Sequence, residues 1–104
     1  MYIVVLITCP DTKEAEKISN VLLKGRLAAC VNIVPDLKSH FWWAGRLHNA
    51  EEVLLIVKTK EKLLREVVSI VKKHHQYENP EVIALPIIGG SKEYTRWIDE
   101  ETKI

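Results

Sequence analysis

The sequence has little of what marks several large classes of protein. Its 104 residues include four glycines, four prolines and two cysteines, Cys9 and Cys30. Two cysteines this far apart form neither a C-x-x-C metal clip nor the disulfide framework of a secreted domain. So few glycines and prolines exclude a low-complexity or collagen-like chain. We therefore expect one globular domain spanning residues 1–104.

The chain also lacks an excess of charge and a long apolar run. Its 15 basic and 14 acidic residues leave a net charge of +1, which gives no electrostatic basis for binding nucleic acid or an anionic membrane. The longest apolar runs, residues 3–7 and 53–57, have the length of a strand and not of a membrane span. No basic-then-apolar signal region follows Met1, so we expect a cytoplasmic protein.

Sequence signatures of catalysis are missing as well. There is no G-x-x-x-x-G-K-[ST] loop, no G-x-G-x-x-G turn and no evident nucleophile elbow. The turn at Thr8–Asp11 has neither the arginine of an acylphosphatase nor the C-x-x-C of a copper chaperone. The sequence thus supports neither an enzymatic activity nor an organic cofactor.

The hydrophobic pattern predicts alternating strands and helices. The expected elements are a strand at 2–8, a helix between Asp11 and Gly25, a strand at 28–43 interrupted by Pro35, a turn at 45–51, a strand at 52–59, a helix from Leu64 to about His75, a strand at 81–88 and a short helix capped by Ser91. The order β-α-β-β-α-β plus one helix predicts an α+β fold, a ferredoxin-like sandwich with two helices on one face of an antiparallel sheet. The strands are apolar on both faces and the last helix is short, so we expect a homo-oligomer that packs sheet against sheet.

The segment His74–Glu81 carries most of the candidate chemistry. In this topology it lies on the same rim of the sheet as Cys9 and the hairpin corner at Trp42–Gly45. A thiol and two imidazoles on one rim favour copper or zinc over magnesium or calcium. We therefore predict a metal site formed by His74, His75 and Cys9.

A structural role for the same histidines is the alternative. Adjacent side chains on a helix point about 100° apart, so both rings reach one ion only if the helix frays after His75. Without fraying, His75 is a polar cap at the helix C-terminus and His74 is solvated. His40 and His48 are expected at the surface.

Four residues are candidates for a ligand groove: Trp42, Trp43, Tyr77 and Glu81. A phenol and a carboxylate facing a small ligand are the functional interpretation of Tyr77 and Glu81. Fixing the loop before the last strand is the structural one. The two tryptophans either line this groove or bury aromatic area at a subunit boundary.

Three sequence blocks resemble the CutA family of divalent-cation tolerance proteins. They are Thr8–Asp11 with Leu27–Asn32, then Ser39–Gly45 with Glu52–Val53 and Lys58–Thr59, and finally His75–Glu81 with Leu85–Pro86, Tyr94 and Trp97. The resemblance implies a ferredoxin-like homotrimer with a PII-like architecture, linked to tolerance of copper and other divalent cations. It also implies a copper site made of paired histidines, matched by His74 and His75, and a cysteine late in the first strand. Ile7 stands at that cysteine position here, with Cys9 two residues on.

Two functions remain open at this point. One is a non-catalytic, cytoplasmic homotrimer that binds copper or another divalent transition metal. The other is a PII-like signalling or interaction trimer that binds a small molecule or a partner protein in grooves between subunits. Interleaved lysine and glutamate on both long helices also suit a heat-stable scaffold whose histidines are incidental.

Overall fold

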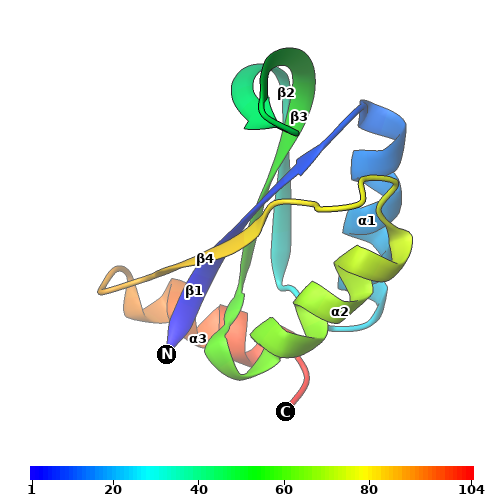
Figure 1. The fold of residues 1–104 in the computed structure, drawn as a ribbon. Coiled ribbons are helices and arrows are strands. Elements are labelled where there is room, and N and C mark those ends of the chain that lie inside the picture. The colour runs from blue at the N-terminus through cyan, green and yellow to red at the C-terminus, as the bar shows by residue number, and fades with distance from the viewer.

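A computed structural model describes all residues, 1–104, and contains the predicted order of elements (Figure 1). The elements are β1 (Tyr2–Cys9), α1 (Thr12–Lys24), β2 (Cys30–Trp43), β3 (Arg46–Lys60), a 3-10 turn (Glu61–Leu63), α2 (Leu64–His74), β4 (Val82–Pro86) and α3 (Lys92–Glu101). The four strands form one antiparallel sheet in the order β2-β3-β1-β4. This order confirms the α+β, ferredoxin-like prediction.

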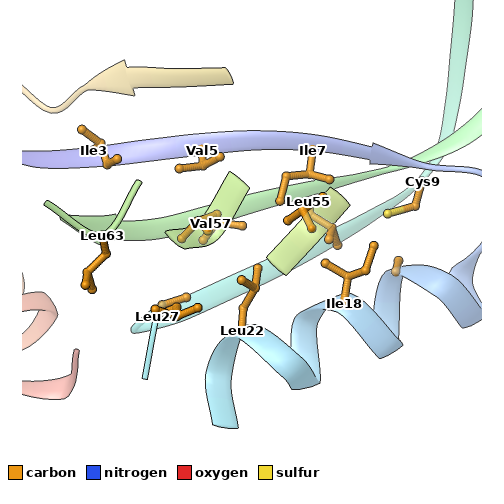
Figure 2. Close-up of a cluster of buried hydrophobic side chains, with 14 of the residues drawn as sticks. Ile3, Val5, Ile7, Cys9, Ile18, Leu22, Leu27, Leu55, Val57 and Leu63 are labelled. Carbon is orange, nitrogen blue, oxygen red and sulfur yellow. The ribbon is translucent and has the colours of Figure 1, made fainter. Parts of the chain in front are cut away.

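The two long helices cover one face of the sheet (Figure 1). Alternate residues of β1 and β3 point toward them, because successive side chains of a strand face opposite ways. The result is one cluster of 15 buried side chains, which includes Val67 of α2. Figure 2 shows Val5, Leu55 and Ile18 among its members. Burying side chains of this size stabilises the fold by about 1.5–3 kcal/mol each. Cys9 is the last member of this row on β1, at the edge of the core nearest the start of α1.

Helix α1 begins and ends where the sequence predicts. The side chain of Asp11 accepts a hydrogen bond from the backbone N–H of Glu14 at 2.8 Å, which satisfies one free donor of the first turn. At the other end, the N–H of Gly25 donates to the carbonyl of Val21 at 3.1 Å. The cap at Asp11 fixes the first turn of α1, and therefore Glu14, beside the end of β1.

The hairpin between β2 and β3 is longer and its turn tighter than predicted. The turn is only Ala44–Gly45, with φ angles of 53° and 75°, and β3 begins at Arg46 instead of residue 52. A two-residue turn with two positive φ angles matches the twist of the strands, so pairing continues to the tip. The pairing register shifts between Val34 and Leu37, which confirms the interruption predicted at Pro35.

The second face of the sheet is apolar and largely open. Val34, Ile83 and Leu85 are exposed there, and neighbouring residues of β1 and β3 are only partly buried. Helix α3 covers only the end of this face near the start of β1. No helix of the chain is long and apolar enough to cross a membrane.

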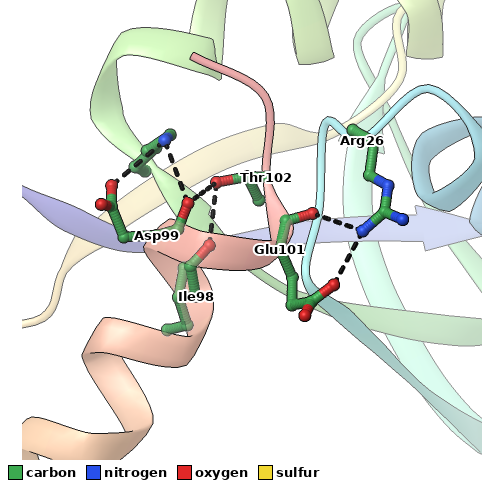
Figure 3. Close-up of polar contacts among 6 residues, drawn as sticks. Arg26, Ile98, Asp99, Glu101 and Thr102 are labelled. Carbon is green, nitrogen blue, oxygen red and sulfur yellow. Dashed lines mark hydrogen bonds and ion pairs between the residues drawn. The ribbon is translucent and has the colours of Figure 1, made fainter.

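Helix α3 is held to the sheet by one buried side chain and several polar contacts. As predicted, it begins after Ser91. The hydroxyl oxygen of Ser91 accepts a hydrogen bond from the backbone N–H of Tyr94 at 3.3 Å. Ile98 is fully buried. Lys60 of β3 pairs with Asp99 at 3.1 Å. Figure 3 shows Thr102 Oγ1 donating to the Ile98 carbonyl at 2.8 Å at the end of α3 itself, and Arg26, in the loop before β2, paired with Glu101 at 2.7 Å. The Arg26–Glu101 ion pair is exposed and worth at most about 1 kcal/mol, so the burial of Ile98 contributes more.

Candidate metal centre and the adjoining hollow

Three potential metal ligands meet where β1 ends, α1 begins and α2 ends. One ligand atom each from Cys9, Glu14 and His75 lies within 4.8 Å of the others. Cys9 and His75 are buried, and Glu14 is nearly so, with 10% of its side chain exposed. The fold thus brings together two of the predicted ligands, Cys9 and His75, and adds a carboxylate.

Both ring nitrogens of His75 have partners. Nε2 lies 2.7 Å from the carbonyl oxygen of Thr8, an acceptor only, so Nε2 carries a hydrogen and donates it. Nδ1 accepts the backbone N–H of Tyr77 at 3.0 Å. This assigns the neutral ring with its hydrogen on Nε2 and a lone pair on Nδ1. The bond to Thr8 ties the end of α2 to the end of β1.

Glu14 has one satisfied and one unsatisfied carboxylate oxygen. Oε1 accepts the N–H of Gln76 at 3.2 Å. Oε2 is buried, has no hydrogen-bond donor, and lies 3.2 Å from His75 Nδ1. In the neutral ring form two acceptors therefore face each other in a buried space. A proton or a metal cation between them removes this repulsion, and the nearby Cys9 sulfur supplies a third ligand for a metal.

The thiol of Cys9 is in its protonated form in this environment. Burial, followed by the carboxylates of Glu14, Asp11 and Glu52, raises the pKa of Cys9 from 9.0 to about 12. A metal is bound by thiolate, so an ion at this position must displace the thiol proton. The donor set of thiol, imidazole and carboxylate fits a soft or borderline transition metal.

His74 lies outside the cluster. It is the last residue of α2 and is half-buried, whereas His75 follows in an extended conformation as the C-cap. The backbone N–H of His75 donates to the carbonyl of Val71 at 2.8 Å. Bringing both imidazoles to one ion requires the last turn of α2 to unwind.

A hollow of about 800 Å³ adjoins the cluster, between the β2–β3 hairpin and residues 76–81. The four predicted groove residues, Trp42, Trp43, Tyr77 and Glu81, all line it within a single chain. His40 and His48 are exposed on its hairpin side, and His48 stacks on Phe41 with ring centres 5.8 Å apart. The hairpin and residues 76–81 therefore meet at one hollow, as the strand directions predicted.

Tyr77 connects the cluster to the hollow. Its ring lies 4.7 Å from that of His75, and its hydroxyl donates to Glu52 Oε2 at 2.8 Å. Burial and this bond to Glu52 raise the pKa of Tyr77. Burial and the charge of Glu52 also raise the pKa of Glu81. The hollow is therefore lined by a buried carboxylate, Glu52, and by the exposed carboxylate of Glu81.

Sequence reasoning missed Glu14 and Glu52. The sequence indicates only a helix start for Glu14, because its contact with His75 joins residues far apart in the chain. For Glu52 a signal existed, since it occupies the position in β3 that continues the alternation of Leu54 and Ile56. A carboxylate in an apolar row indicates a specific partner.

The fold is the ferredoxin-like sandwich, and a cluster of three side chains of the kinds that bind metals, Cys9, Glu14 and His75, lies at its rim. The family model described as "CutA1 divalent ion tolerance protein" matches residues 3–101. The chain therefore belongs to the CutA1 family, which is named for tolerance of divalent ions and not for a catalysed reaction.

Similar proteins cover nearly the whole chain. The "Divalent-cation tolerance protein CutA" of Archaeoglobus fulgidus is 47% identical over 100 residues, covering 96% of this chain and 97% of that protein. The "Protein CutA 1, chloroplastic" of Oryza sativa is 44% identical over 97% of this chain, which spans only 57% of the rice protein. The solved "Divalent cation tolerance protein (Cut A1)" of Thermus thermophilus superposes with a TM-score of 0.97 at 45% identity, covering 99% of this chain and 100% of that one.

The names of these relatives contradict the expectation of a cytoplasmic protein. The rice protein is named chloroplastic, and the solved Archaeoglobus fulgidus structure, with a TM-score of 0.96 at 46% identity, is named periplasmic. The expectation was wrong because it relied only on the residues after Met1. Relatives with this fold are named for more than one compartment, so those residues do not decide the location.

Proposed function

We propose that this chain is a non-catalytic, homotrimeric protein of divalent-cation tolerance that binds copper or another divalent transition metal at Cys9, His75 and His74. Glu14 joins these ligands. The main support is the buried Glu14 Oε2, which lacks a donor and lies 3.2 Å from His75 Nδ1. A buried carboxylate oxygen without a partner is costly, and a cation at this position compensates it.

Binding has two costs that follow from the contacts in the cluster. The Cys9 thiol must lose its proton, and His75 Nδ1 must give up the hydrogen bond from the Tyr77 N–H. Metal affinity should therefore rise with pH, as ligand deprotonation requires. His74 becomes a ligand only if the end of α2 opens, so Cys9 and His75 contribute the larger share.

Competition titration with a chelator tests the proposal. Cu(I) and Cu(II) are titrated into the wild-type protein and into Cys9→Ala, His75→Ala, His74→Ala and Glu14→Gln variants of verified oligomeric state. His48→Ala, an exposed histidine on the hairpin, is the matched control. We expect at least tenfold weaker binding for the Cys9 and His75 variants and no change for the control. Equal affinity in all variants would exclude this site.

The homotrimer is supported by the open, apolar face of the sheet. Exposed Val34, Ile83 and Leu85 form a patch of the kind that subunit contacts cover. Replacing Ile83 with glutamate should convert the trimer into a smaller species in analytical ultracentrifugation. A wild-type monomer in the same measurement would exclude the trimer.

A second function is favoured by the hollow itself. A volume of about 800 Å³ with aromatic and carboxylate walls is within the range of small-molecule sites. In this alternative the chain acts as a PII-like interaction trimer that binds a small molecule or a partner protein. A thermal-shift screen in the presence of a chelator separates the two functions, since a stabilising ligand then acts without metal.

A further inference from the structure

The formally charged side chains that line the hollow are all acidic. Three glutamates, Glu52, Glu78 and Glu81, line it together with two histidines, and no lysine or arginine does so. The chain as a whole has a net charge of +1, so this acidity is local and does not reflect the composition.

Glu52 is the most buried of these three carboxylates, since Glu78 and Glu81 are exposed. It is 7% exposed and forms no ion pair, and its only side-chain hydrogen bond is the one that Oε2 accepts from the Tyr77 hydroxyl. Glu81 lines the same hollow, where partial burial and then the charge of Glu52 raise its pKa. Buried carboxylates are normally paired with a cation, and here the protein supplies none.

The remaining walls of the hollow are aromatic. Trp42, Trp43 and Tyr77 line it, and Trp42 is 73% exposed. The faces of such rings attract ammonium and guanidinium groups and also bury apolar atoms. A bare metal ion uses none of this surface, and the hollow contributes no group of three metal-ligand atoms within 4.8 Å.

We propose that the hollow binds a small organic cation, an ammonium or guanidinium group on an apolar body, with the charge at Glu52 and Glu81 and the body against Trp42 and Trp43. This inference rests on the second function above and names its ligand class. The cationic head lies near the Tyr77 hydroxyl, and the volume of about 800 Å³ accommodates a substantial apolar part.

Three probes of nearly equal shape test the charge requirement. Phenethylammonium, 2-phenylethanol and phenylacetate share one apolar body and differ in carrying a positive, zero or negative charge. Isothermal titration calorimetry of the full chain, in its solution assembly and with a metal chelator present, should show binding of phenethylammonium. We expect at least tenfold weaker binding of the other two probes.

Variants locate the binding. Glu52→Gln keeps an acceptor for the Tyr77 hydroxyl and removes the charge, so it should weaken phenethylammonium binding at least tenfold while leaving the melting temperature close to that of the wild type. Glu81→Gln should weaken it as well. Glu100→Gln, an exposed carboxylate on α3, is the matched control and should leave binding unchanged.

Each outcome separates this inference from the functions proposed above. Equal binding of the three probes overturns the cation requirement and leaves the hollow as a ligand site. Binding by none of them overturns the inference, and the thermal-shift screen with a chelator then decides the small-molecule function separately. Copper titration of the same samples reports on the metal cluster independently.

Discussion

Glu14 Oε2 and His75 Nδ1 face each other at 3.2 Å in a buried space between the first turn of α1 and the end of α2. Nδ1 accepts the Tyr77 N–H, so no hydrogen is left to join the two atoms in the neutral ring form. The protein thus maintains a local repulsion that a bound cation removes. Relief of this repulsion when a cation binds adds to the free energy of binding.

Glu14→Gln should separate stability from metal binding. The amide keeps an oxygen for the Gln76 N–H and turns an NH2 donor toward Nδ1. This replaces the repulsion between two acceptors with a donor that shares the Nδ1 lone pair with the Tyr77 N–H. We expect the metal-free variant to be more stable by about 0.5–1.5 kcal/mol, the worth of one hydrogen bond. Its copper affinity should fall. Urea unfolding at pH 8 measures the first effect, with the exposed Glu16→Gln as control. A destabilised variant would contradict the assignment of the lone pair to Nδ1.

Tyr77→Phe should destabilise the fold through Glu52. The substitution removes the 2.8 Å hydrogen bond and leaves a carboxylate that is 7% exposed without a donor. The expected loss is about 1–3 kcal/mol in the free energy of unfolding. Tyr2→Phe, whose hydroxyl forms no hydrogen bond within the chain, is the matched control. In the Glu52→Ala background, which removes the acceptor, the effect of Tyr77→Phe should shrink, and an unchanged effect would mean that the bond has no role.

Alkaline pH should destabilise the protein through Cys9. Its pKa is raised by burial from 9.0 to about 12, so between these values the folded chain keeps a proton that the unfolded chain loses. The stabilisation is fully present below pH 9 and is lost as pH rises toward 12. Between pH 8 and pH 10.5, the free energy of unfolding measured with denaturant should decrease less for Cys9→Ala than for the wild type. For the control Cys30→Ala, the free energy of unfolding should decrease as much as it does for the wild type.

The hairpin turn offers a test of backbone conformation alone. Gly45 has a φ of +75° and Gly89 does not have a positive φ, and an added Cβ meets no atom within 4 Å at either position. Gly45→Ala should therefore destabilise by about 1 kcal/mol, whereas Gly89→Ala should be neutral or slightly stabilising. Thermal unfolding compares the two, and equal shifts would contradict the turn geometry.

Features decided by neighbouring residues were predictable from the sequence. The caps at Asp11 and Gly25 define α1 because each acts within one turn of the helix. The β2–β3 turn was not predictable in the same way. Ala44 adopts a positive φ that its side chain disfavours, and cross-strand pairing from Arg46 onward stabilises it. Here a tertiary interaction overrides a local preference.

The candidate site was predictable only in outline. Strand directions bring Cys9, the end of α2 and the hairpin corner to one rim, because topology fixes which ends meet. The contacts within that rim depend on side-chain packing. His75 turns into the cluster as an extended C-cap while His74 stays on the helix, and Glu14 enters from the opposite helix. The spacing of residues along the chain does not predict such contacts.

X-ray absorption of the zinc-loaded protein tests the central claim most directly, because it identifies the atoms that bind the metal. A site at Cys9 and His75 predicts one sulfur neighbour at about 2.3 Å together with nitrogen or oxygen neighbours at about 2.0–2.2 Å. The sulfur shell should disappear in Cys9→Ala and persist in Cys30→Ala. A first shell of nitrogen and oxygen alone in the wild-type protein would contradict the account.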